Sequence, residues 1–296
     1  MYNERSSFDQ LSIERTVKDL SNLGIRQSPL TWEKAKRWAR QLEAGPEKAL
    51  GWLILRYLVF RTTDQLESSL RQALKEAAQY FGEGAGLPQE TNWKTILDGS
   101  ASNLNFYCSP PTLNTYGQPG KSGELIARLV NRAFKIAKSY AYDFTIFTAD
   151  ERLLIVDDAS FTGEQIGGFL DNYSPAKSSP EKIAIILAIA HESALSNLNK
   201  RHPNVKVFCG ETISTVHCFE STAKSWEAKG LWPYPDQPPI EVYNNLCKKH
   251  NLVNSGGSSL GFGGLGIMVG YEHGIPDDSL KILWGESDTW SPLIER

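Results

Sequence analysis

The segment that most restricts the fold is a short apolar run at residues 153–156, followed directly by two acids, Asp157 and Asp158. The run reads Leu-Leu-Ile-Val and offers no polar residue to solvent. This is typical of a strand buried on both faces, as the strands of parallel sheets are. Because ligands of open α/β sheets bind beyond the carboxyl ends of the strands, we expect the two acids to lie at a binding edge.

Similar apolar runs recur along the chain, each followed by a loop and a stretch with helical spacing. They lie at residues 104–108, 144–147, 153–156, 183–190 and 205–208. Alternating strands and helices predict βαβ units. We therefore predict an α/β fold with a mostly parallel sheet of about five strands, in a domain over residues 101–296. Two more apolar runs, 265–269 and 280–284, are expected to be late strands of this domain.

Residues 1–100 lack this alternation and predict a separate helical segment. Thr31, or the Ser28-Pro29 pair, is placed to cap an early helix, and residues 47–60 form a second, apolar one. A third helix follows from one apolar stripe at helical spacing, made by Leu66, Leu70, Leu74, Ala77 and Phe81.

The charge balance argues against some classes of partner. The chain has 31 Lys and Arg against 34 Asp and Glu, so its net charge is -3. The overall positive charge typical of a nucleic-acid or anionic-membrane binder is therefore absent. Four basic residues of an early helix are interpreted as a solvated face, with a polyanion site as the alternative: Lys34, Lys36, Arg37 and Arg40.

Cysteine spacing and hydropathy suggest where the protein works. Cys108, Cys209, Cys218 and Cys247 are far apart and form neither a disulfide framework nor a zinc motif, which fits a reducing compartment. Residues 1–10 show no signal peptide, and residues 49–60 are too short for a membrane span of about twenty residues. We expect a cytoplasmic protein with no membrane segment.

The residues after the acidic pair are suited to holding a phosphate. Backbone N–H groups at the start of a helix near Glu164 bind anions, Thr162 adds a hydroxyl, and Gly163 allows close approach. Asp157 and Asp158 are placed to accept hydrogen bonds from a ribose diol or to hold Mg²⁺ through water. The alternative is a solvated surface turn. The predicted phosphate loop consists of Ala159, Ser160, Phe161, Thr162, Gly163, Glu164 and Gln165.

Residues 153–166 resemble the phosphoribosyl-pyrophosphate (PRPP) loop of type I phosphoribosyltransferases: an apolar strand, two acids, then Thr-Gly. The resemblance implies a phosphoribosyltransferase-style fold and a ribose 5-phosphate site. Asp157 and Asp158 would bind the ribose hydroxyls, and the loop would bind the 5′-phosphate. One position departs from the family: Gln165 stands where Thr or Ser is common, which removes one hydroxyl expected on the phosphate.

The C-terminal region carries a second resemblance. It rests on Gly264-Leu-Gly266, residues 273–284, Trp290-Ser-Pro-Leu293 and Arg296, with the helical stretch 49–81 and Ser122-Gly123. These are similar to a phosphoribosyltransferase-like family associated with bacterial conflict systems. Membership implies an effector of anti-phage defence, with a gene often beside a partner such as a retron reverse transcriptase. It does not supply the substrate.

Two further groups are candidates for the same edge. In the phosphoribosyltransferase arrangement, the loop that contains Lys121, Ser122 and Gly123 faces the pyrophosphate, offering a charge, a hydroxyl and a close backbone. The alternative is a surface loop with a helix cap at Ser122. His191 follows the run 183–190 and could act as acid or base, or simply bond a neighbouring backbone group.

The last part of the chain offers less specific signals. His273, Asp277 and Asp278 form either a lid or a structural turn. Trp284 and Trp290 are interpreted as core or docking residues, so the apolar C-terminus is expected to dock on the body of the protein.

The favoured function is binding of PRPP or a nucleotide, with transfer or cleavage at C1′ of the ribose. Mg²⁺ and Lys121 would stabilise the leaving pyrophosphate. The alternatives are a non-catalytic sensor that controls a partner, and a scaffold for a reverse transcriptase and its nucleic acid. The sequence leaves open whether the protein is catalytically active and which acceptor it uses. It also leaves open the oligomeric state, for which a homo-oligomer is one possibility.

Overall fold

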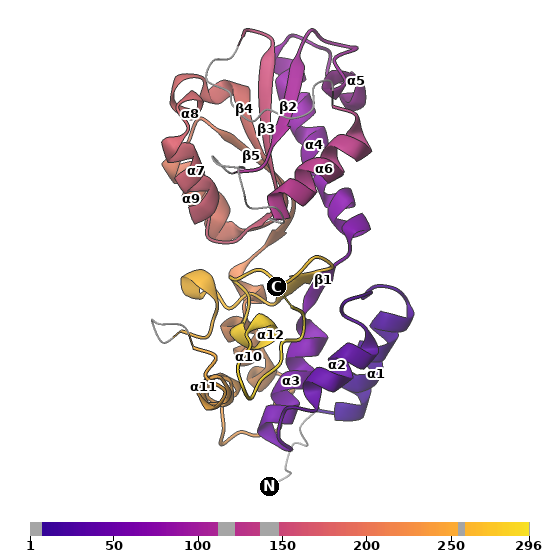
Figure 1. Cartoon of the computed structure of the whole chain (residues 1–296), viewed down its shortest axis with the longest axis vertical. Helices are drawn as coiled ribbons and strands as arrows, with labels where there is room; N and C mark the ends of the chain where they lie inside the picture. The colour runs from indigo at the N-terminus through magenta and orange to yellow at the C-terminus, as the bar shows by residue number, and fades with distance from the viewer. Residues whose placement is uncertain (1–7, 112–121, 137–147, 254–257, 296) are drawn as a thin grey trace. The chain divides into compact units, whose positions relative to one another are not determined.

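A four-stranded parallel sheet lies at the centre of the part of the chain that holds the predicted site (Figure 1). The computed structural model describes residues 8–111, 122–136, 148–253 and 258–295. The strands are β2 (Asn105–Ser109), β3 (Glu151–Ser160), β4 (Ile183–His191) and β5 (Lys206–Ile213), in the order β2-β3-β4-β5. All three strand pairs are parallel, which confirms the predicted α/β class. The strand predicted at residues 144–147 lies outside the described residues.

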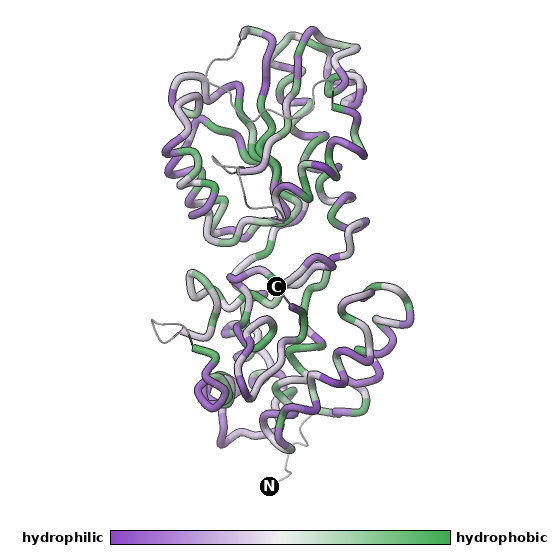
Figure 2. The backbone as a smooth tube through the Cα atoms, viewed as in Figure 1, coloured by the Kyte–Doolittle hydropathy of each residue, from purple (hydrophilic) through white to green (hydrophobic). Residues whose placement is uncertain are grey.

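Helices cover both faces of this sheet (Figure 1). On one face, α7 (Glu164–Asn172) and α9 (Glu192–Arg201) pack with Ile155 and Ile185 in one apolar cluster. On the other face, α4 (Thr63–Gly84) places the ring of Phe81 5.7 Å from that of Phe106 in β2, and α6 (Ser122–Phe134) lies beside it. The shorter helices here are α5 (Trp93–Leu97) and α8 (Pro175–Ser178). The strands are the most apolar part of this region (Figure 2).

A second group of helices is built from both ends of the chain. Its first part is α1 (Gln10–Asn22), α2 (Trp32–Ala39), α3 (Pro46–Tyr57) and β1 (Val59–Arg61). Its last part is α10 (Phe219–Ala228), α11 (Pro239–Lys249), β6 (Val269–Tyr271) and α12 (Lys281–Trp284). The strands β1 and β6 pair in parallel as a separate two-stranded sheet. As predicted, Thr31 caps α2: its Oγ1 accepts a hydrogen bond from the Lys34 amide at 3.2 Å.

The chain divides into two compact units, Asp64–Ser214 and a unit made of Met1–Thr63 with Thr215–Arg296. The domain boundary predicted at residue 100 coincides with neither division between these units, which fall after Thr63 and after Ser214. The helix α4 belongs with the sheet it covers, because its apolar stripe packs on the strands. The C-terminal residues belong with the first helices, because Met268 and its neighbours share an apolar core with α1–α3.

Three expectations for apolar runs were wrong. The run 265–269 contributes only Val269 to a strand, because β6 covers Val269–Tyr271. The run 280–284 is the helical turn α12 rather than a strand, and the helix expected over residues 47–60 ends at Tyr57. A short apolar run does not reveal by itself whether it is helix or strand. Pairing decides the last two cases: residues 59–61 form β1 because β6 lies beside them, and residues 281–284 have no neighbouring strand among the described residues.

The C-terminal residues dock on the body of their unit, as predicted. The Trp290 ring meets the ring of Trp38 edge to face at 5.7 Å. Both indole N–H groups donate to the carbonyl of Ile282, Trp38 at 3.3 Å and Trp290 at 3.0 Å. Leu293 is fully buried in the same core. This segment is therefore part of the fold rather than an appended tail.

Candidate functional site

The predicted acids, the loop after them and His191 come from neighbouring strands at one edge of the sheet. The three strands run in parallel, and Ser160 pairs with Ala190, which in turn pairs with Thr212. The carboxyl ends of β3, β4 and β5 therefore lie side by side. This is the edge at which ligands of parallel α/β sheets bind.

The acidic pair lies inside β3 rather than after it. The strand continues past the apolar run to Ser160, because Asp157 pairs with Leu187 of β4 and Ala159 with Ile189. Asp157 is only 4% exposed and Asp158 only 8%. The carboxylates are thus held by the sheet, and not by a surface turn.

This position has an electrostatic cost. Burial, and then the neighbouring charge of Asp158, raise the pKa of Asp157 well above its usual range. Each acid accepts one nearby amide: Asp157 Oδ1 that of Asp158 and Asp158 Oδ1 that of Ala159, both at 3.0 Å. The energetic cost of burying two adjacent carboxylates falls when a cation or sugar hydroxyls bind them.

The loop after β3 is short and leads directly into a helix. Phe161 is buried, and Gly163 adopts the left-handed conformation with φ +80° as the N-cap of α7. Thr162 Oγ1 accepts a weak hydrogen bond from the Glu164 amide at 3.4 Å. Of the predicted phosphate loop, Ala159 and Ser160 are the end of β3, while Glu164 and Gln165 are the exposed first residues of α7. A helix therefore begins where the anion site was predicted.

His191 is the last residue of β4 and is 1% exposed. Its Nδ1 accepts the Ser193 amide at 3.1 Å, which caps α9. Nδ1 also lies 2.7 Å from Ser193 Oγ. The amide contact is the backbone bond considered as the alternative to chemistry. The catalytic role of His191 stays a prediction.

The predicted pyrophosphate loop is described only in part. Ser122 and Gly123 begin α6, whereas Lys121 lies outside the described residues. The role of these three residues at a pyrophosphate stays a prediction.

The donor set at the edge fits Mg²⁺ as a partly hydrated ion. Within the described ranges, no three His, Cys, Asp or Glu side chains are grouped to enclose a metal. Asp157 and Asp158 supply two carboxylates, and Mg²⁺ is commonly held by one or two carboxylates together with water and substrate phosphates. All four cysteines lie within the described residues and are free thiols.

His273, Asp277 and Asp278 lie in the other unit, near β6. The His273 ring stacks on Tyr271 at 5.0 Å. The carbonyls of Asp277 and Asp278 accept the amides of Phe262 and Ile267 at 2.7 and 3.4 Å. These bonds favour the structural turn over the lid.

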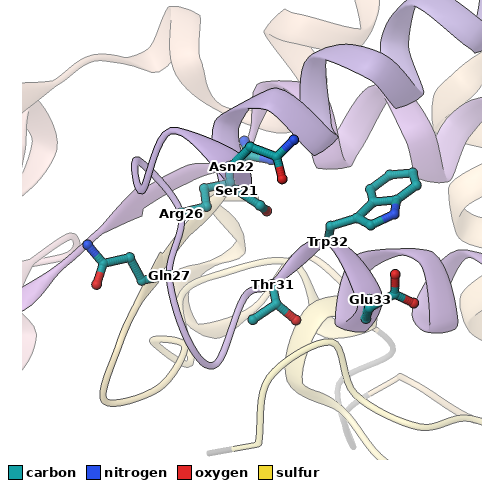
Figure 3. A pocket seen from close by; sticks show the side chains of 7 residues that line it. All are labelled: Ser21, Asn22, Arg26, Gln27, Thr31, Trp32 and Glu33. Carbon is teal, nitrogen blue, oxygen red and sulfur yellow. The ribbon is translucent and has the colours of Figure 1, made fainter.

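The same unit has a cavity of about 370 Å³ beside α2, shown in Figure 3. Its lining residues are Ser21, Asn22, Arg26, Gln27, Thr31, Trp32 and Glu33. Arg26 is buried and donates to the carbonyl of Leu58 at 2.6 Å, and its burial lowers its pKa to about 10. The Trp32 ring stacks on the Trp52 ring, with 5.9 Å between the ring centres. Lys36 Nζ lies 5.9 Å from the centre of the Trp32 ring. Arg26 Nη2 is engaged with the Leu58 carbonyl, whereas Nη1 is buried and makes no hydrogen bond within the described part of the chain.

Sequence reasoning missed Ser193 and Asn197 of α9, which contact the loop after β3. Polar residues on a helix that follows a strand are common, so the pattern alone carries no signal for them. Only the packing of α7 on α9 shows that they reach the loop.

An all-parallel sheet with two buried acids in β3 and a glycine-started helix behind them defines an α/β protein with a phosphoribosyltransferase-like fold. A family model described as PRTase-CE matches residues 35–296, so the chain belongs to the PRTase-CE family. This confirms the resemblance at the level of a phosphoribosyltransferase-like family and supports phosphoribosyltransferase-like function. A comparison with curated proteins found no match. In the described parts of the chain, none of the helices has the length and apolar character needed to cross a membrane.

Proposed function

We propose that this protein binds a phosphoribosyl compound, PRPP or a nucleotide, at the carboxyl edge of β3. Asp157 and Asp158 would hold the ribose hydroxyls, and residues 159–165 the 5′-phosphate. The observation that carries the proposal is the buried acidic pair, whose cost to folding is relieved by a ligand with hydroxyls or a cation.

The chemistry we propose takes place at C1′ of the ribose. With PRPP, the bond from C1′ to the pyrophosphate oxygen breaks, and a bond from C1′ to an acceptor nitrogen or oxygen forms. With a nucleotide, the glycosidic bond breaks and water supplies the new oxygen. Positive charge develops on the sugar, and the carboxylates of Asp157 and Asp158 would stabilise it. Mg²⁺, when bound, neutralises the leaving pyrophosphate.

The biological setting belongs to the same proposal. The similarity of the C-terminal residues to proteins of bacterial conflict systems supports an effector role in anti-phage defence in the cytoplasm, with a retron reverse transcriptase as a candidate partner. A sensor that binds the ligand without turnover is the second candidate, because His191, the predicted acid or base, is engaged in capping α9.

One experiment separates these functions. Purified protein is incubated with PRPP, MgCl₂ and nucleotides from a cell extract, and the products are read by mass spectrometry. An enzyme forms or consumes a ribosylated species, and the Asp157→Asn/Asp158→Asn variant does not. The matched control is Asp236→Asn, an exposed acid of the other unit, which should match the wild type. Saturable binding without product indicates the sensor. Neither signal, with co-purifying nucleic acid, indicates the scaffold.

The exposed Gln165 offers a direct test of the phosphate loop. We expect Gln165→Thr to bind PRPP about three- to tenfold more tightly, since one added hydrogen bond is worth about 1 kcal/mol. Titration calorimetry measures the affinity. Gln165→Ala serves as the control, because it removes the amide without adding a hydroxyl. Equal affinity in all three proteins would show that this position does not contact the phosphate.

A further inference from the structure

The first turns of α9 hold the backbone of the loop after β3. Ser193 Oγ donates to the carbonyl of Phe161 at 2.9 Å, and Asn197 Nδ2 donates to the carbonyl of Thr162, also at 2.9 Å. Two successive loop carbonyls are therefore bound by side chains of one neighbouring helix.

Two glycines face α9 here: Gly163, the N-cap of α7, and Gly167 within α7. A Cβ at Gly163 would lie 3.2 Å from the carbonyl oxygen of Ala194, and a Cβ at Gly167 would lie 2.7 Å from Arg201 Nη1. The contact at 163 is with the backbone of α9, whereas the one at 167 is with the flexible end of the Arg201 side chain, which can move aside. The absence of a side chain at 163 thus lets the loop approach α9 closely.

Holding these carbonyls also orients the loop amides. The C=O and N–H of one peptide unit point in opposite directions, since the unit is planar and trans. With the carbonyls of Phe161 and Thr162 directed at α9, the N–H groups of Thr162 and Gly163 point away from it. Within the described residues, neither amide donates a hydrogen bond. They are therefore available to an anion at the N-terminus of α7.

The same helix controls the charge at this position. Glu164 is the first residue of α7, and its carboxylate would repel a phosphate bound there. Asn197 Nδ2 donates to Glu164 Oε1 at 3.0 Å, and Arg201 Nη1 lies 3.3 Å from Glu164 Oε2. The carboxylate is thus paired with α9.

We propose that α9 is the positioning element of the phosphate site. Ser193 and Asn197 hold the loop in the form whose amides face an anion, and Asn197 with Arg201 keeps the Glu164 carboxylate engaged. This inference rests on the proposed function, and it identifies Asn197 as the central positioning residue because it contacts both the Thr162 carbonyl and Glu164.

The test measures binding of ribose 5-phosphate with MgCl₂ by titration calorimetry. We expect Asn197→Ala to weaken binding about tenfold. Asn197→Asp, which has the same shape but no donor, is expected to weaken it at least as much. Ser193→Ala is expected to lose about threefold and Ser193→Thr, which keeps the hydroxyl, to bind like the wild type. The control is Asn172→Ala, which removes a 2.8 Å hydrogen bond to the Gly168 carbonyl at the other end of α7. It should bind like the wild type.

Hydrogen exchange supplies a second readout. Ribose 5-phosphate should protect the amides of residues 162–165 in the wild type and in Ser193→Thr, but less in Asn197→Ala and Ser193→Ala. Wild-type affinity in Asn197→Asp and Ser193→Ala would overturn the positioning role while leaving the proposed function intact. Absence of binding by the wild type itself would overturn the proposed function, and this inference with it.

Discussion

The Asp157→Asn protein will unfold at a higher temperature than the wild type at pH 8 and will no longer bind ribose 5-phosphate with Mg²⁺. In the folded protein, burial and Asp158 raise the pKa of Asp157 above its value in the unfolded chain. Stability is therefore lost as the pH rises from the unfolded pKa toward the folded one, because the unfolded chain releases this proton first. Asparagine removes that loss, and its Oδ1 can still accept the Asp158 amide.

Thermal unfolding at several pH values checks the sign. The advantage of Asp157→Asn should be about 2 °C or more at pH 8, since about 1 kcal/mol corresponds to about 2–4 °C for a domain of this size. It should shrink as the pH falls below about 4, the ordinary pKa of an aspartate, because the acid then becomes protonated in both states. Asp171→Asn is the control of opposite sign, because a hydrogen bond from Arg201 lowers the pKa of Asp171. A variant that is less stable than the wild type at every pH would contradict the prediction.

Replacing Trp290 by alanine should lower the free energy of unfolding by about 3–5 kcal/mol, the range for removing a large buried aromatic side chain. Trp290 is 2% exposed, packs edge to face on Trp38, and donates to the Ile282 carbonyl. The substitution leaves a cavity between α2 and α12 and removes one of the two donors to that carbonyl. Guanidinium unfolding followed by far-UV circular dichroism measures the change.

The matched control is Phe262→Ala, an aromatic residue of the same unit that is 55% exposed. A change within about 0.5 kcal/mol is expected there. Hydrogen exchange should show faster opening of α2 and α12 in Trp290→Ala, with the sheet strands β3 and β4 unchanged. A loss below about 1 kcal/mol would mean that the C-terminal segment contributes little to this core, despite its burial.

The acidic pair connects stability with function. A sheet strand that buries two adjacent carboxylates is less stable than one with apolar residues at those positions. Such a cost is common where the charge is needed for a ligand or a reaction. If Asp157→Asn is both more stable and unable to bind, the two effects together locate the site at these atoms. Greater stability with unchanged binding would mean that the energetic cost of burying Asp157 is unrelated to binding of the proposed ligand.

Local sequence patterns predicted several strands and helix starts of this protein. The apolar runs predicted the parallel strands β2, β3, β4 and β5, because a strand covered on both faces needs apolar residues throughout. The Thr-Gly pair after β3 predicted the start of α7, and Thr31 predicted the start of α2, because caps are satisfied within a few residues. The apolar C-terminus predicted its own burial.

The remaining features of the fold and of the candidate site could be seen only in the tertiary structure. It extended β3 through Asp157 by pairing with β4, made residues 281–284 a helix, and paired β1 with β6 from the far end of the chain. It also brought Ser193 and Asn197 to the loop that follows β3. Each of these outcomes depends on contacts between segments distant in sequence. Periodicity and capping record only whether a residue is buried and what its near neighbours are, so they carry no information about which distant partner it meets.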